Sequence, residues 1–259
     1  MEMNLVKENI KTGEVVCQKY SQTMAESDVI VPDTKPDIQK ILEVSGTVCI
    51  TKKMLQQDKA FIQGIIKMNV LYLPEDDENG RIRSLCADLE FNHSLDCRGA
   101  AADMQLFAEA VPESFDATLI NGRRLNLRCV LGISVKVVRP MLLSLTTGVE
   151  NADDIALKKE RFRFISDTDG CECQIILRDQ LALPAGKPAI GEILKVTAVP
   201  TGTELCLMEN KAVAKGQVRI ATLYNSEEDH SLQFMEHTLP FTEILDVDGA
   251  AEGMQGDAD

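Results

Sequence analysis

The chain has 259 residues, and its 27 lysines and arginines are outnumbered by 41 aspartates and glutamates, which gives a formal net charge of −14. A strongly negative protein is repelled by nucleic acid and by anionic lipid, so we expect neither as a partner. Aromatic residues make up 4% of the chain and tryptophan is absent, which leaves few surfaces for stacking bases or sugar rings. No apolar run approaches the roughly 18 residues of a membrane-spanning helix, and we expect no membrane insertion.

Eight cysteines are scattered along the chain without a Cys-x-x-Cys pair, and only Cys171 and Cys173 lie close together. In a chain of this length, such spacing is typical of reduced thiols rather than of a disulfide framework. The first eight residues lack the basic and apolar segments of a signal peptide. These features predict a cytoplasmic protein of one or two domains.

The first predicted element is a short helical turn at residues 32–36, a Pro-x-x-Lys-Pro box. Pro36 suits the first helical position behind a capping residue at 33 or 34. Apolar residues follow at helical spacing: Ile38, Ile41 and Leu42. The simpler interpretation is that the turn only anchors these residues in the core. The functional interpretation is that Lys35, and Lys187 in a second box, contact an acidic partner.

The box opens a repeat, because residues 31–44 recur as residues 183–196 at a constant offset of 152. The matches stay in register through an acidic loop in each copy, and after a two-residue deletion they resume at an offset of 150. Matched pairs along this stretch are Gly64 and Gly216, Tyr72 and Tyr224, Phe91 and Phe241, and Met104 and Met254. A repeat of this length predicts two tandem domains rather than a solenoid of short units.

Strands account for most of the remaining pattern. Residues 62–73 and 213–224 are predicted as equivalent strands, and their tyrosines, Tyr72 and Tyr224, as core residues rather than a ligand site. Residues 125–137 alternate strictly between apolar and other side chains, which predicts a strand with one buried face. The Asn-Gly pair at 121–122 favours a type I′ hairpin turn in front of that strand.

The predicted fold is therefore mainly β, with two tandem domains of the β-sandwich or barrel type, each with the helical turn. We place the first domain at residues 1–140, a linker at 141–170 and a second, truncated domain at 171–259. The second copy is incomplete because nothing in it matches the hairpin at residues 117–138. Missing strands leave sheet edges open, and open edges favour strand exchange or a homo-oligomer.

Motifs of catalysis are absent from the sequence. The three histidines, His93, His230 and His237, have no ligand partner at metal spacing. No nucleophile elbow, phosphate-binding loop or zinc-protease motif is present. We expect no enzyme activity, cofactor or metal, and the alternative of a Cys–His enzyme requires a thiol within hydrogen-bond reach of an imidazole.

Two segments carry a family resemblance. The run DVIVPDTKPDI at residues 28–38, with Ile41 and Leu42 after it, resembles the opening of the SPOCS domain, and LINGRRLNL at residues 119–127 is similar to its closing strands. This family occurs in spore-forming Firmicutes and includes SipL of the Clostridia. The resemblance covers a full copy at about 15–140 and a partial copy at about 171–254, without the LysM module common in the family.

The resemblance implies a non-enzymatic scaffold of endospore coat assembly, located in the mother-cell cytoplasm at the outer surface of the forespore. It implies other coat morphogenetic proteins as partners, such as the SpoIVA-type ATPase that assembles the coat. The candidate partner-contact residues are the charged ones of the box and hairpin: Lys35, Asp37, Lys187, Arg123 and Arg124. The alternative function is a saccharide- or small-molecule-binding module of the spore envelope, which requires a concave site with convergent polar groups.

Overall fold

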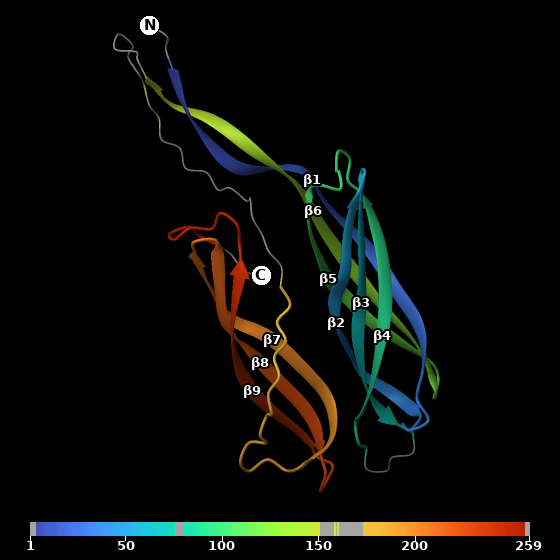
Figure 1. Ribbon diagram of the computed structural model, residues 1–259. Coiled ribbons are helices and arrows are strands. Elements are labelled where there is room, and N and C mark those ends of the chain that lie inside the picture. The colour runs from blue at the N-terminus through green and yellow to red at the C-terminus, as the bar shows by residue number, and fades with distance from the viewer. Residues whose placement is uncertain (1–3, 76–79, 151–157, 159, 161–172, 257–259) are drawn as a thin grey trace.

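The computed structural model describes residues 4–75, 80–150, 158, 160 and 173–256. Nine strands and no helix lie in these residues (Figure 1). The strands are β1 (Asn4–Ile30), β2 (Ile38–Gln56), β3 (Lys59–Pro74), β4 (Arg83–Asp96), β5 (Gln105–Asn121), β6 (Arg124–Glu150), β7 (Ile190–Met208), β8 (Lys211–Ser226) and β9 (Leu232–Asp246). The prediction of a mainly β fold is confirmed.

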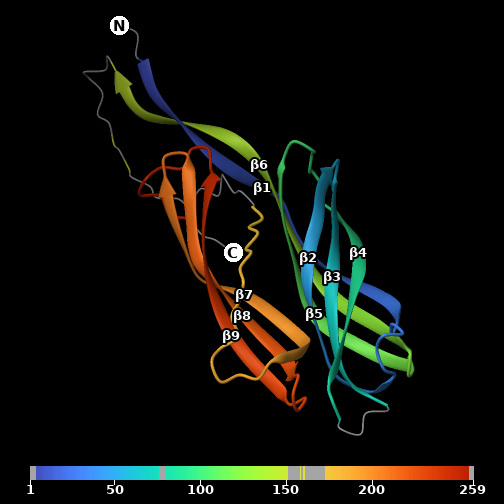
Figure 2. The same cartoon turned by 60° about the horizontal axis from the view of Figure 1, so that its bottom comes forward.

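The first unit contains two three-stranded antiparallel sheets, ordered β1-β6-β5 and β2-β3-β4. The sheets pack face to face as a sandwich, which Figures 1 and 2 show from two sides. In β6, every second residue from Leu125 to Val137 is at most 2% exposed, so the predicted alternation holds over its whole length. Burial of each large apolar side chain contributes about 1.5–3 kcal/mol to stability. The packing of the buried side of β6 against the other sheet is therefore the main stabilising interaction of the first unit.

The predicted helical turn at the Pro box is wrong. Residues 32–36 form a single turn closed by a hydrogen bond from the Lys35 N–H to the Pro32 carbonyl (2.9 Å), and β2 begins at Ile38. Pro36 has no N–H to extend the turn into a helix. The second box forms the same turn, from the Lys187 N–H to the Pro184 carbonyl (3.1 Å).

The helical spacing after the box has another cause, namely β-bulges. The pairing of β2 with β3 shifts register between Ile38 and Lys40 and again between Ile41 and Glu43. Each bulge inserts one extra residue, so inward-facing side chains stand three positions apart instead of two. Strand β7 has its bulges at the matching positions, directly after Ile190 and after Ile193.

The β5–β6 hairpin forms as predicted, but its turn is not of type I′. Asn121 pairs with Arg124, so the turn residues are Gly122 and Arg123, and neither has the positive φ that a type I′ turn requires. The Asn121 side-chain oxygen instead accepts a hydrogen bond from the Arg123 N–H (3.0 Å). Glycine at 122 lets the turn approach Asp37 closely, because a Cβ there would lie 3.3 Å from the Asp37 side chain, a tight contact. The hairpin tip thus lies directly against the box.

The second unit is a single antiparallel sheet ordered β7-β8-β9, the counterpart of β2-β3-β4. Among the described residues, no strand of this unit corresponds to β5 or β6, and residues 173–189 form no strand. Strand β6 continues through Glu150, so residues 141–150 of the predicted linker are strand. The rest of that linker, apart from residues 158 and 160, lies outside the described residues.

The two copies share their turn geometry in detail. After β2, the Asp58 N–H donates to the Ala100 carbonyl (3.0 Å), and after β7 the Asn210 N–H donates to the Ala250 carbonyl (2.8 Å). Both residues have positive φ, 58° and 54°, a conformation that Asp and Asn tolerate well. The loop after the third strand therefore closes over the first turn in the same way in both units.

The two matched tyrosines are core residues, as predicted. Tyr72 and Tyr224 are both 0% exposed, and each donates its hydroxyl proton to a carbonyl of its own box: that of Pro36 at 3.3 Å and that of Pro188 at 3.1 Å. The hydroxyl ties the end of the central strand to the turn before the first strand. Burial raises the pKa of Tyr72, so this phenol stays protonated and keeps donating.

A phenylalanine covers a glycine at the same cross-strand pair in each sheet. Gly64 of β3 is opposite Phe91 of β4, and Gly216 of β8 is opposite Phe241 of β9. A Cβ at Gly64 would lie 2.5 Å from the Phe91 ring, and one at Gly216 would lie 2.8 Å from the Phe241 ring. The ring fills the space that the missing side chain leaves.

We predict that Gly64→Ala lowers the free energy of unfolding by about 1–3 kcal/mol, because the new methyl group overlaps the Phe91 ring and the Cys49 carbonyl. Gly148→Ala is the control, since a Cβ there meets only Val6 at 3.6 Å, an ordinary contact, and should change stability by less than about 0.5 kcal/mol. Urea denaturation followed by circular dichroism measures both, and equal effects would contradict the assignment.

Candidate interaction site

Arg123, at the tip of the β5–β6 hairpin, reaches across to the box and makes four hydrogen bonds there. Nη1 donates to the carboxylate of Asp37 (2.7 Å) and to the carbonyl of Lys35 (3.3 Å). Nη2 donates to the carbonyl of Val31 (2.9 Å) and to the carboxylate of Asp33 (3.0 Å). One guanidinium thereby joins the hairpin of one sheet to the turn that leads into the other.

Each arginine at the hairpin tip is paired with an aspartate of opposite charge. The hydrogen bond to Asp37 is the main cause that raises the pKa of Arg123. The neighbouring Arg124 pairs with Asp28 across β1 and β6. The pKa of Asp28 is lowered, first by the hydrogen bond from Asn126 (2.9 Å) and then by Arg124, so this carboxylate stays ionised.

The second unit lacks both acids that bind Arg123. Ala185 and Ala189 stand at the positions of Asp33 and Asp37. The described part of this unit also has no hairpin that could bring an arginine to its box. The acids are therefore present in the copy with a hairpin and missing from the copy without one, which indicates that their role in the first unit is to hold Arg123.

Lys35 contacts the second unit of its own chain. Its Nζ lies 3.1 Å from a carboxylate oxygen of Glu192 on β7, and the other oxygen of Glu192 accepts a bond from Arg83 of β4 (2.6 Å). These side chains are between a quarter and a third exposed, so the pair of bonds is partly shielded from solvent. Lys35 therefore has an acidic contact within its own chain, and its predicted contact with a partner protein stays a prediction.

Amide side chains extend this contact between the units. Asn69 of β3 donates to the carbonyl of Leu194 (3.0 Å), and Asn225 of β8 donates to the carbonyl of Ile82 (2.8 Å). Leu194 is 1% exposed, whereas its counterpart Leu42 is 43% exposed. The difference arises because the first unit covers this part of β7.

Sequence reasoning missed the β7 side of the contact. Positions 192 and 195 hold Glu and Lys, whereas the matched positions in β2 hold Lys40 and Glu43, so the charges are reversed between the copies. Lys195 forms an ion pair with Glu43, its own counterpart in the repeat. This reversal was the available signal that the two copies face each other.

Lys187 differs from Lys35 in its surroundings. It is exposed on the second box, and within the described residues it forms no ion pair. Of the five candidate partner-contact residues, Lys35, Asp37, Arg123 and Arg124 are bound to groups of the same chain. A role in partner binding stays a prediction for all five, and Lys187 is the most available.

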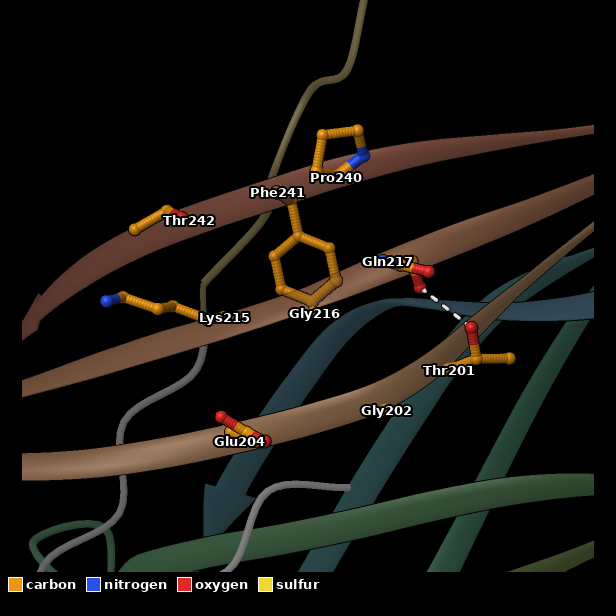
Figure 3. Close-up of a pocket in the computed structure, with 9 residues that line it drawn as sticks. All are labelled: Thr201, Gly202, Glu204, Lys215, Gly216, Gln217, Pro240, Phe241 and Thr242. Carbon is orange, nitrogen blue, oxygen red and sulfur yellow. Dashed lines mark hydrogen bonds between the residues drawn. The ribbon is translucent and has the colours of Figure 1, made fainter.

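An open hollow of about 460 Å³ lies across β7, β8 and β9 (Figure 3). The Phe241 ring projects over Gly216, and the Thr201 hydroxyl donates to the Gln217 carbonyl (3.3 Å). Phe241 is the only aromatic residue that lines the hollow. Tyr72 and Tyr224 are buried, and the exposed Tyr20 and Phe234 do not line the hollow, so the hollow itself offers one ring for stacking a sugar.

Two of the three histidines, His93 and His237, have an oxygen atom as hydrogen-bond partner. His93 Nε2 lies 3.1 Å from the Ser21 hydroxyl, and burial lowers the pKa of His93. His237 Nε2 lies 2.8 Å from the Ala182 carbonyl. No group of three or more histidine, cysteine or acidic residues suited to a metal ion occurs in the part of the chain that the structure describes.

The sequence model of the family described as "SipL, SPOCS domain" matches residues 37–120 and 189–259, more than half of the chain. The chain belongs to this family. The SPOCS matches begin at β2 and at β7, and so recover the duplication seen in the bulges, turns and buried tyrosines. No curated protein and no solved structure matches the chain. The family identifies a sporulation-related domain, present here in two copies.

No helix of the described residues has the length and apolar character to cross a membrane. The SPOCS units of this chain are built from strands alone over the described residues, and the sandwich of the first unit holds its hairpin through Arg123.

We predict that Arg123→Gln lowers the denaturation midpoint, because the shorter amide cannot reach both carboxylates and both carbonyls. Arg124→Gln is the matched control and should lower the midpoint less, since Arg124 and Asp28 form one exposed pair. Ala189→Asp should leave stability nearly unchanged, because the described second unit has no arginine to meet it. Thermal denaturation measures all three, and an equal effect of Arg123→Gln and Arg124→Gln would contradict the assigned role.

The reactivity of the cysteine thiols tests which of them are buried in the fold. Burial raises the pKa of Cys97 and of Cys129 to about 11, and a hydrogen bond from the Cys97 thiol to Cys17 also raises the pKa of Cys97. At pH 8 only about one in a thousand such thiols is ionised. We predict that the exposed Cys49, Cys86, Cys173 and Cys206 react with Ellman's reagent at least tenfold faster than Cys17, Cys97 and Cys129. Unfolding in guanidinium should remove the difference, and fast labelling of Cys129 in the native protein would contradict the buried assignment.

Proposed function

We propose that this chain is a non-enzymatic scaffold of endospore coat assembly that binds other coat morphogenetic proteins at the forespore surface. The observation that carries the proposal is the pairing of two sporulation-related SPOCS units, one closed into a sandwich and one with a sheet face left uncovered. A closed unit gives a stable body, and an uncovered apolar sheet face is typical of an interaction surface.

The charge distribution supports a protein partner. The net charge of −14 opposes nucleic acid and anionic lipid. Exposed Lys187 on a rigid turn is suited to an acidic protein surface, such as one on a SpoIVA-type ATPase. The open hollow at Phe241 has a single aromatic ring, which gives a saccharide ligand little to stack on.

The proposal predicts that a fluorescent fusion of the chain encircles the forespore in sporulating cells. The ring should disperse when the SpoIVA-type ATPase is absent, because the scaffold then has no base on which to assemble. Fluorescence microscopy with timed samples measures this, and a diffuse signal throughout sporulation would overturn the proposal.

A charge reversal in the same experiment tests the partner contact. Lys187→Glu should weaken the ring and reduce co-purification of the ATPase. Lys211→Glu, an exposed lysine of the same unit at the far end of the sheet, is the matched control and should leave both unchanged. Equal effects of the two variants would indicate a general charge effect rather than a contact at the box.

A further inference from the structure

The second unit leaves the inner face of its sheet uncovered on the β7 side. Ile190, Ile193 and Val196 are 38%, 50% and 55% exposed. Their counterparts in the first unit belong to its core: Ile38 is 2% exposed, and Ile41 and Val44 pack against the buried cluster. We name the side of β7-β8-β9 that carries Ile190, Ile193, Val196 and Phe241 the open face.

In the first unit, the sheet β1-β6-β5 covers β2-β3-β4. Part of an equivalent covering layer is present in the second unit. In the first unit, β1 lies over β4, and Ser21 of β1 contacts His93. In the second unit, the Ala182 carbonyl contacts His237 of β9, so residues 173–183 occupy the place of β1 (Figure 1). They form no strand, because the described unit has no counterpart of β6 to pair with them. The layer that is missing is therefore two antiparallel strands wide.

The first unit carries a two-stranded antiparallel extension that covers nothing. Strand β5 ends its pairing with β6 at Val138, and beyond that point β6 pairs only with β1. We name this extension, residues 4–15 of β1 and 139–150 of β6, the ribbon. It runs out past the sandwich in both views (Figures 1 and 2). A free two-stranded ribbon is only marginally stable in water, so it is expected to pack against another surface.

One face of the ribbon continues the covering face of the first unit. In β6 the odd-numbered residues from Leu125 to Val137 face the core, and the same side continues through Met141, Leu143 and Leu145. These three are 41%, 39% and 37% exposed. Ile10 of β1 is paired with Leu143 and lies on that side as well. The ribbon thus presents the kind of apolar surface that β6 presents to β2-β3-β4.

The open face and the ribbon therefore match. The gap over the open face and the ribbon are both two strands wide, both surfaces are apolar, and they correspond to the two sheets that pack together in the first unit. The open face is a copy of the sheet that β1-β6-β5 covers, and the ribbon is a continuation of that covering sheet. The ribbon carries three basic and three acidic residues, so it can approach an acidic unit without net repulsion. The ribbon lacks an Arg123-like anchor, which agrees with the alanines at 185 and 189 in the second box.

We propose that the ribbon of one chain packs on the open face of a second copy of the same chain, where it takes the place of the two missing strands. Its backbone edge meets residues 173–183, which form no strand and in which, among the described contacts, only the Gln180 N–H and the Ala182 carbonyl are already hydrogen-bonded, so this segment can take part in strand addition. The occupant is a second copy because, within its own chain, the ribbon does not pack on the β7-β8-β9 sheet, and both surfaces stay exposed. The contact is heterologous, so two copies close into a dimer if the geometry permits and otherwise extend into a longer assembly.

This inference stands apart from the coat function proposed above, and self-association of the purified chain tests it. Sedimentation velocity from about 1 to about 100 µM should show the wild type associating with increasing concentration. Leu143→Glu on the ribbon and Val196→Glu on the open face should each give monomers over that range. Leu142→Glu on the opposite side of the ribbon and Ile244→Glu on the opposite side of the sheet are the matched controls, and both should associate as the wild type does.

A mixture of the Leu143→Glu and Val196→Glu chains tests whether the ribbon binds the open face directly. The ribbon of the Val196→Glu chain is intact, and so is the open face of the Leu143→Glu chain, so the mixture should restore a heterodimer with one contact. Wild-type protein that stays monomeric, dissociation by the control variants, or a mixture without heterodimer would each overturn the proposal.

Both defective variants alter exposed side chains, and circular dichroism should show native folding for each. If one of them fails to fold, Leu145→Glu and Ile193→Glu replace it on the same surfaces and lead to the same expected outcomes.

Discussion

The packing of one sheet on another is the interaction on which the first unit depends. Alternate residues of β3 and β6 face each other across the sandwich, and together they supply most of the buried apolar side chains. Arg123 then joins the two layers at one end, where the hairpin tip meets the Pro box. The duplicated sheet β7-β8-β9 has the bulges, turns and buried tyrosine of its counterpart but lacks this complete cover, so its inner face is an exposed apolar surface of the described chain, as is one side of the ribbon.

Duplication followed by divergence accounts for the charged residues. The acids that hold Arg123 are replaced by alanines in the copy without a hairpin. Glu192 and Lys195 stand where the first copy has Lys40 and Glu43, and they bind Arg83, Lys35 and Glu43 across the contact between the units. Residues that differ between matched positions thus identify the contacts specific to each copy, whereas residues that agree identify the common fold.

Most of the fold was predictable because strands with one buried face leave a period of two in the sequence. The alternation at residues 125–137, the offset of the repeat and the core role of Tyr72 all follow from local pattern, and the structure confirms them. The prediction of a helical turn was wrong because the bulges in β2 place the inward-facing side chains three residues apart. The sequence pattern of such a bulged strand cannot be distinguished from that of a helix. The predicted type I′ turn was wrong because Asn121 pairs with Arg124, which makes Gly122 and Arg123 the turn residues, and neither has positive φ; Gly122 instead lies close to Asp37, a residue distant in sequence. The partner of Lys35 was missed for the same reason, since Glu192 lies 157 positions away in the chain.

The pairing of β1 with β6 has a consequence for biosynthesis. Asn4 pairs with Glu150, so β1 leaves the ribosome well before β6, the strand with which it pairs. Contacts between residues so far apart in sequence form slowly, whereas β2, β3 and β4 meet through short local turns. The nascent chain therefore carries an unpaired β1 until β6 has been synthesised, and this strand is a segment that chaperones have reason to shield.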